Sequence, residues 1–254
     1  PLAAIVAQAA GFRAEDLVLE PSAGTGMLAI FAQIAGVRQA LNELAETRRA
    51  LLGHLFPDAV IADHDAASID DRLDRSVKPS VVVMNPPFSA ANHVEGRFRQ
   101  ATSQHVLSAL ARLAPGGRLV VITGESFRPS TKSFQSTFQR IASSADVVFS
   151  AAIDGKVFSR HGTTIDTRLT VIDKRPVGAD GGVPVAIEAA YHRICGTTSD
   201  LLASVLTHCP ERRSPPPCPT TSALSVPSQP TRTNLHALRN AARKETRALA
   251  EERA

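Results

Sequence analysis

The sequence lacks long apolar runs, a leader pattern and paired cysteines. No run approaches the roughly 18 apolar residues needed to span a bilayer, and the start, PLAAIVAQAAGF, has neither the basic flank nor the cleavage pattern of a signal peptide. Cys195, Cys209 and Cys218 form no C-x-x-C pair, so neither a disulfide framework nor a zinc site is predicted. We therefore expect a cytoplasmic protein with free thiols, no membrane span and no metal.

An excess of positive charge is also missing from the main part of the chain. The net charge is +4, but residues 1–209 contain 20 Lys and Arg against 20 Asp and Glu, whereas residues 210–254 contain 8 against 4. Affinity for a phosphate backbone comes from clustered Lys and Arg. Charge alone therefore does not indicate a nucleic-acid partner, and any such evidence has to come from motifs.

Short apolar runs alternate with amphipathic stretches from residue 1 to about 175. This alternation is typical of an α/β fold in which a mostly parallel sheet has helices on both faces. The last two strands follow each other without a helix between them, so we expect the last one to run antiparallel. Seven strands are expected at 16–21, 37–44, 59–64, 80–86, 117–124, 145–153 and 167–174, and helices near 2–10, 26–35, 46–55, 98–113 and 130–143.

The organisation changes after residue 176. Residues 177–209 form a poorly defined extension, in which VAIEAAYHRI (185–194) is a candidate strand and SDLLASVL (199–206) a short helix. Seven prolines between Cys209 and Pro230 predict an extended linker over 210–233. Residues 234–254 have helical propensity and few apolar residues, so we expect a helix that begins a further region. The main domain is expected over 1–176.

A glycine turn follows the first expected strand. SAGTGMLAI (22–30) places Gly24 and Gly26 where missing side chains let a ligand approach the backbone. Glu43 ends the second strand, where a carboxylate can accept both hydroxyls of a ribose. The turn also fits the dinucleotide pattern, but Glu20 at the end of the first strand favours a cationic ligand over a pyrophosphate. S-adenosylmethionine, with a sulfonium, an ammonium and no phosphate, is therefore the expected cofactor.

Asp65 follows the third expected strand, in ADHDAASID. Its carboxylate can accept a hydrogen bond from the adenine amino group of the cofactor. It can equally well cap the start of a helix. The sequence leaves both roles open.

The fourth expected strand ends on Asn85, Pro86, Pro87 and Phe88. Strand ends at the carboxyl edge of an open α/β sheet line the ligand crevice, so this motif faces the same cleft as the glycine turn. The Asn85 side-chain oxygen and the Pro86 carbonyl can hold the two hydrogens of an exocyclic amine and so localise its lone pair for attack on a methyl group. Phe88 can stack on a flat base.

The two motifs together resemble those of the N6-adenine class of S-adenosylmethionine-dependent DNA methyltransferases. EPSAGTG (20–26) matches the cofactor motif and NPPF (85–88) the amino-methylation motif, in the order that this class uses. The stretches LNELAETRRALLGHLFP, SVVVMNPPFSA and RHGTTIDTRLTVIDK look like the N-terminal methylase part of plasmid and phage methylase/helicase fusions of the strawberry-notch type. The resemblance implies a Rossmann-like class I methyltransferase domain and a helicase region after the linker.

The resemblance also implies roles for particular residues. The cofactor would contact the set Glu20, Pro21, Ala23, Gly24, Gly26, Glu43, Asp65 and Asn85. Asn85, Pro86, Pro87 and Phe88 would be catalytic, and Phe88 together with Phe158 would hold an adenine flipped out of DNA. No target-recognition domain is evident in 176–254, so sequence specificity is not implied.

Two other hypotheses stay open at the level of the sequence. An RNA amine or a protein glutamine presents the same planar N–H₂ group to the same motif, so the substrate polymer is not fixed by it. A domain that only recruits nucleic acid to a helicase would keep the fold without the activity.

Overall fold

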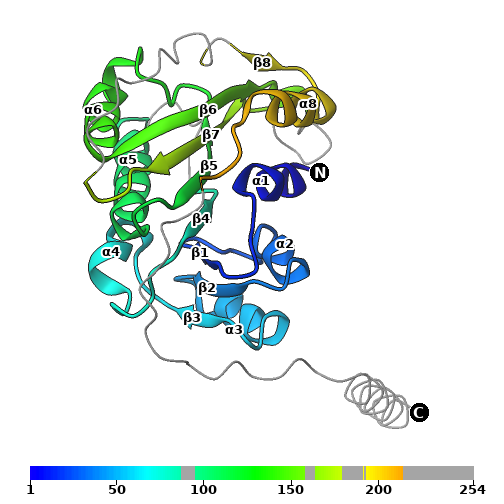
Figure 1. Ribbon diagram of the computed structural model, residues 1–254, viewed down its shortest axis with the longest axis vertical. Helices are drawn as coiled ribbons and strands as arrows, with labels where there is room; N and C mark the ends of the chain where they lie inside the picture. Colours follow the sequence, from blue (N-terminus) through cyan, green and yellow to red (C-terminus); the bar gives the residue numbers. More distant parts are fainter. Residues whose placement is uncertain (87–94, 158–163, 179–190, 192, 214–254) are drawn as a thin grey trace. The chain divides into compact units, whose positions relative to one another are not determined.

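The computed structural model describes residues 1–86, 95–157, 164–178, 191 and 193–213 (Figure 1). Within them a single sheet contains eight strands in the order β3-β2-β1-β4-β5-β7-β6-β8. The strands are β1 (Leu17–Glu20), β2 (Arg38–Asn42), β3 (Val60–Ala62), β4 (Val81–Met84), β5 (Arg118–Gly124), β6 (Ala145–Ile153), β7 (Thr167–Lys174) and β8 (Ile194–Cys195).

The first five strands run parallel to one another, and β7 lies antiparallel between β5 and β6. All seven expected strands are present, and the prediction of an antiparallel last strand in this set is confirmed. The count of seven is wrong, because the two-residue strand β8 pairs parallel with the outer side of β6. The candidate strand at 185–194 overlaps β8 only at Ile194, and its other described residues, Tyr191 and Arg193, are not in a strand.

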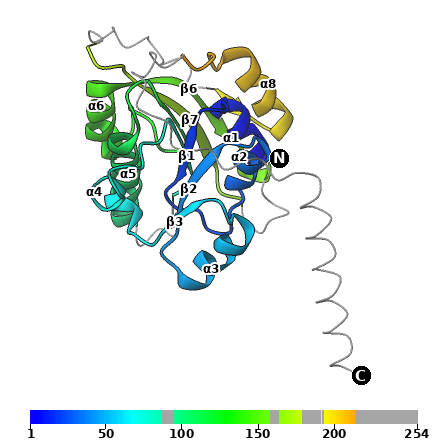
Figure 2. The same cartoon turned by 60° about the horizontal axis from the view of Figure 1, so that its bottom comes forward.

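Helices cover both faces of the sheet. They are α1 (Leu2–Ala10), α2 (Ala29–Ile34), α3 (Glu46–Leu55), α4 (Ile69–Arg72), α5 (Glu95–Arg112), α6 (Gln135–Ser144) and α8 (Thr198–His208), with 3-10 turns η1 (Ala66–Ser68) and η2 (Lys132–Phe134). The helices expected at 2–10 and 46–55 have those bounds, whereas η1 and α4 were not expected. Figure 2 shows α4, α5 and α6 on one side of the sheet and α1, α2 and α8 on the other.

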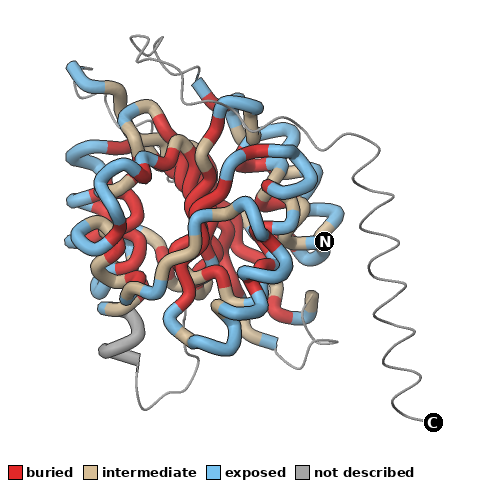
Figure 3. Tube along the Cα trace, turned by 90° about the horizontal axis from the view of Figure 1, so that it is seen from below, coloured by how far each residue is buried: buried red, intermediate tan, exposed pale blue. Residues whose placement is uncertain are grey.

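Alternate strand residues feed two separate cores. Leu19, Val82 and Val121 pack against α5 and α6, whereas Val18, Val81 and Val120 pack against α1 and α8. A smaller cluster joins α2 to α3 through Leu52 and Phe56, among others. This alternation is the expected behaviour of strands buried on both faces. In Figure 3 the buried segments lie at the centre and the exposed ones around them.

The amino edge of the parallel strands, where those strands begin, holds a buried ion pair between distant residues. Arg212 donates to both carboxylate oxygens of Asp16 at 2.8 Å, and the two side chains are 3% and 2% exposed. Ser80 also donates to Asp16 at 2.6 Å, and Arg13 donates to the main-chain carbonyl of Arg212. The segment after α8 is therefore attached beside the start of β1.

The chain divides into two units, Pro1–Pro216 and Pro217–Ala254, and the sheet with all the helices named above belongs to the first. Within the described ranges, no helix combines the length and apolar character needed to cross a bilayer. The same ranges contain no group of three or more His, Cys, Asp or Glu side chains that could hold a metal ion.

Candidate functional site

The turn between β1 and α2 has the backbone that its glycines predict. Gly24 and Gly26 have φ angles of 56° and 81°, in the left-handed region that glycine adopts at little cost. The Gly26 amide donates to the Ala23 carbonyl at 2.8 Å, which closes the turn. A Cβ added at Gly24 would meet nothing within 4 Å, whereas one added at Gly26 would lie 2.4 Å from the Phe56 ring. Gly24 is thus open to a ligand, and Gly26 is needed for packing.

Glu43 follows β2 and reaches back to the glycine turn. Its Oε2 accepts from the Gly24 amide at 2.8 Å, and its Oε1 accepts from the Ala45 amide and from Arg48, both at 2.8 Å. Partial burial raises the pKa of Glu43, but the hydrogen bonds from Arg48, Ala45 and Gly24 outweigh it and hold the pKa below its usual value. Glu43 is therefore an ionised acceptor fixed beside the turn.

Glu20, the last residue of β1, is 3% exposed, and its Oε2 has no hydrogen-bond partner among the described residues. Burial raises its pKa well above the usual value; the Ala29 amide lowers it in part, and the charge of Glu43 raises it further. The Ser22 hydroxyl in the same turn is likewise buried without a partner in the described part of the chain. A ligand that brings hydrogen-bond donors or positive charge to this turn would satisfy both atoms.

Asp65 caps the turn η1. Its Oδ1 accepts from the Ala67 amide at 2.9 Å, and the side chain is exposed. Of the two roles that the sequence left open, the cap is seen in the structure. Asp65 also lies after β3 at the carboxyl edge of the sheet, so the cap does not remove it from the neighbourhood of Glu43.

Asn42 is a positioning residue that the sequence analysis missed. It is 1% exposed, and its amide nitrogen donates to the carbonyls of Pro21 and His64 at 2.8 Å each. Its oxygen accepts from the His64 amide at 2.8 Å. Asn42 thus ties the glycine turn to the segment before Asp65. The sequence feature that could have indicated this role is an amide side chain at the end of the second strand, directly before Glu43.

Leu44, the residue after Glu43, was also missed. It is 65% exposed although it is a large apolar residue at the carboxyl edge. Exposed apolar surface beside an ionised carboxylate is suited to the face of a base whose ribose the carboxylate could hold. The signal was an apolar residue directly after the acid that ends the second strand.

Asn85 and Pro86 come directly after β4, which pairs with β1 in the register Leu19↔Val82. This register places the ends of the two strands side by side at the carboxyl edge. Asn85 is exposed and Pro86 is buried. Pro87, Phe88 and Phe158 lie outside the described residues, so their expected roles stay predictions. The structure thus brings the first half of NPPF next to the glycine turn.

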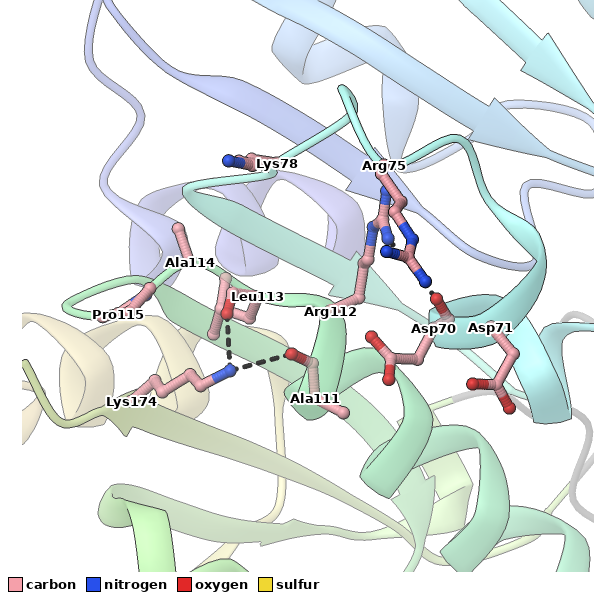
Figure 4. Close-up of a pocket in the computed structure, with 10 residues that line it drawn as sticks. All are labelled: Asp70, Asp71, Arg75, Lys78, Ala111, Arg112, Leu113, Ala114, Pro115 and Lys174. Carbon is pink, nitrogen blue, oxygen red and sulfur yellow. Dashed lines mark hydrogen bonds between the residues drawn. The ribbon is translucent and has the colours of Figure 1, made fainter. Parts of the chain in front are cut away.

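A cavity of about 550 Å³ lies at the opposite, amino edge of the sheet (Figure 4). Lys174 on its wall donates to the carbonyls of Leu110, Ala111 and Leu113 at 2.7–2.9 Å, at the end of α5. Arg112 donates to the carbonyls of Val77, Asp70 and Asp74. Both cations are thus held by main-chain oxygens, and the cavity is remote from the glycine turn.

The chain matches no protein-family model and no curated protein. Several solved structures resemble it. A protein from Listeria monocytogenes described as a putative class I S-adenosylmethionine-dependent methyltransferase has a TM-score of 0.60 and 13% identity, over 82% of this chain and 69% of that one. A type I restriction-modification methyltransferase subunit from Streptococcus thermophilus has a TM-score of 0.61 and 15% identity, over 84% of this chain and 53% of that one. The M protein of the type I restriction enzyme EcoKI has a TM-score of 0.55 and 18% identity, over 70% of this chain and 43% of that one.

This chain therefore spans about half, or less, of the two restriction-modification subunits. Identities of 13–18% establish likeness of fold alone. The strand order, with β7 antiparallel between β5 and β6, agrees with that likeness. The described residues have the Rossmann-like fold of the class I methyltransferases.

Proposed function

We propose that this chain transfers a methyl group from S-adenosylmethionine to the N6 amine of adenine in DNA. The observation that carries the proposal is the position of Asn85-Pro86 at the end of β4, beside the end of β1 with its buried Glu20 and the glycine turn. A methyl donor and an amine acceptor would then share one edge of the sheet. Two of the similar structures belong to type I restriction-modification systems, which supports DNA as the substrate.

The residues of the turn fit S-adenosylmethionine. Glu20 has a buried oxygen without a donor in the described chain, which suits a cationic ligand and disfavours a pyrophosphate. The space beside Gly24, where a side chain would otherwise lie, is open to a ligand. Glu43 is an ionised acceptor suited to ribose hydroxyls. Leu44 and Asp65, which both follow strands at the carboxyl edge, would lie beside the adenine of the cofactor. When bound, the cofactor would supply an electrophilic methyl group.

The chain's own contribution to the reaction is to hold the amine. The Asn85 side-chain oxygen and the Pro86 carbonyl would each accept one hydrogen of the amine. These two acceptors favour the pyramidal nitrogen, whose lone pair is free to attack, over the planar one. One amine proton leaves to solvent afterwards, so no strong base is required. Flipping the adenine out of the duplex costs a few kcal/mol, which stacking on Phe88 would offset in part.

The larger protein in this proposal continues into a helicase region after residues 210–233. This part rests on the sequence resemblance.

The test is methylation of genomic DNA by the full chain, followed by analysis of the nucleosides. We expect N6-methyl-2′-deoxyadenosine with the wild-type chain and none with Asn85→Ala, while S-adenosylmethionine binding by calorimetry stays nearly intact. Gln139→Ala removes an exposed amide from α6 and serves as the matched control. Equal methylation of DNA by Asn85→Ala would refute the assigned role.

A second candidate function, methylation of a protein glutamine, is favoured by the charge balance of residues 1–209, which shows no basic excess for binding the phosphates of DNA or RNA. An RNA amine or a protein glutamine would suit the same two acceptors. Labelled cofactor incubated with separate DNA, RNA and protein pools distinguishes these substrates. A chain that binds no cofactor and labels no pool would instead be a recruitment domain.

A further inference from the structure

Arg48 forms an ion pair with the proposed ribose-binding carboxylate. It lies in the first turn of α3, and its Nη2 is 2.8 Å from Oε1 of Glu43. The two side chains differ in freedom, because Arg48 is 52% exposed and Glu43 is 6% exposed. One partner is therefore fixed and the other is able to move.

The two carboxylate oxygens of Glu43 differ in how many hydrogen bonds they can still accept. An ionised carboxylate has about four acceptor sites, two on each oxygen. Oε1 already accepts two hydrogen bonds, from the Ala45 amide and from Arg48, whereas Oε2 accepts one, from the Gly24 amide. A ribose that offers its two neighbouring hydroxyls to the carboxylate needs one free site on each oxygen. Oε2 has that site and Oε1 does not.

Only one of the three donors can leave without a change of backbone. The amides of Gly24 and Ala45 belong to the glycine turn and to the start of α3, so their positions are set by the fold. Arg48 reaches Glu43 through a long, half-exposed side chain that water can solvate. The ribose would therefore take the position of Arg48 on Oε1.

We propose that Arg48 competes with the ribose diol of the cofactor for Oε1 of Glu43, and so sets how strongly this chain depends on the two ribose hydroxyls. The proposal rests on the proposed function, because it assumes that Glu43 binds a nucleoside. It makes Arg48 a specificity-determining residue whose removal strengthens binding. A residue that contacted the ribose favourably would have the opposite effect.

The test compares four nucleosides by calorimetry with the wild-type chain and Arg48→Ala. S-adenosylmethionine, S-adenosylhomocysteine and adenosine carry both hydroxyls, and 2′,3′-dideoxyadenosine carries neither. Exposed ion pairs are weak, so we expect Arg48→Ala to bind the first three about two- to fivefold more tightly. The affinity for 2′,3′-dideoxyadenosine should not change. Arg48→Gln, which keeps much of the side-chain length, should give the same direction of change.

Arg140→Ala is the control for loss of one positive charge, since Arg140 is exposed on α6, on the other face of the sheet. It should leave all four affinities unchanged. The proposal is overturned if Arg48→Ala binds the diol-bearing ligands equally or more weakly, or if dideoxyadenosine gains as much as adenosine. If the wild-type chain binds none of the ligands that carry both hydroxyls, the proposed function itself fails and the role of Arg48 fails with it.

Discussion

Replacing Gly26 by Ala tests whether the glycine turn is shaped by packing as well as by backbone conformation. Gly26 has a φ of 81°, and a left-handed conformation costs a residue with a Cβ about 1–2 kcal/mol. The new Cβ would also lie 2.4 Å from Cε2 and 2.8 Å from Cζ of Phe56. Phe56 is 1% exposed within the α2–α3 cluster, so its ring cannot swing into solvent.

The two contributions give an expected loss in the free energy of unfolding. Forcing an extra methyl group into a packed core costs about 1–3 kcal/mol. Added to the backbone term, this gives about 2–5 kcal/mol for Gly26→Ala. Gly24→Ala is the matched control, because Gly24 also has a positive φ of 56° but its Cβ would meet nothing within 4 Å. We expect it to lose only the backbone term of about 1–2 kcal/mol.

The assay is urea unfolding at neutral pH, with the double variant Gly26→Ala/Phe56→Leu completing a mutant cycle. A leucine side chain at position 56 is smaller than phenylalanine and leaves room for the new Cβ at position 26. The double variant should therefore be more stable than the sum of the two single changes predicts, by at least about 1 kcal/mol. Equal losses for the two glycine variants, or an additive double variant, would refute the packing argument. The turn would then be constrained by backbone conformation alone.

Three further predictions concern stability. Arg212→Ala leaves the buried carboxylate of Asp16 without its cation and should lower the free energy of unfolding, measured in urea, by about 3–5 kcal/mol. Arg213→Ala, at an exposed neighbouring residue, should lower it little, and equal losses for the two variants would contradict the role of the ion pair. Burial raises the folded-state pKa of Glu20 above its unfolded value, so the contribution of Glu20 to stability is present at low pH and is lost as the pH rises through the folded pKa. The urea midpoint of the wild-type chain should therefore fall above about pH 4.3, and Glu20→Gln should flatten that fall. An unchanged slope of urea midpoint against pH in Glu20→Gln would count against this reasoning. Thr197→Ala removes the side-chain cap of α8 and should cost about 0.5–2 kcal/mol by the same assay, while an unchanged midpoint would show that the cap is dispensable.

Much of the fold can be predicted from local patterns. Runs such as SVVVM specify a strand buried on both faces, and the glycines after DLVLE specify a turn, because these features depend on residues close together in the sequence. The positions of Glu20 and Asn85-Pro86 at the carboxyl ends of two expected parallel strands also predicted that both would lie at one edge. The structure places these segments beside each other, as β4 pairs with β1.

The contacts that set the chemistry of the site were less accessible to prediction. The sequence indicated Glu43 as an acceptor, but the donors that already occupy it depend on how α3 starts relative to the turn. The bridge from Asn42 to Pro21 and His64 likewise requires β1, β2 and β3 to be in register. The pair of Asp16 and Arg212 joins residues 196 positions apart, and no local pattern connects them.

That separation has a consequence for the order in which the chain folds. During synthesis Asp16 and α1 leave the ribosome before the rest of this unit, whereas the ion partner of Asp16 and the helix α8 that packs against α1 are among the last parts of the unit to appear. Contacts of such long range form slowly, because a large loop must close before they stabilise anything. Helix α1 and the start of β1 therefore stay incompletely covered until almost the whole unit has been synthesised. Closure of the amino edge should therefore be among the last steps by which the unit reaches its native state.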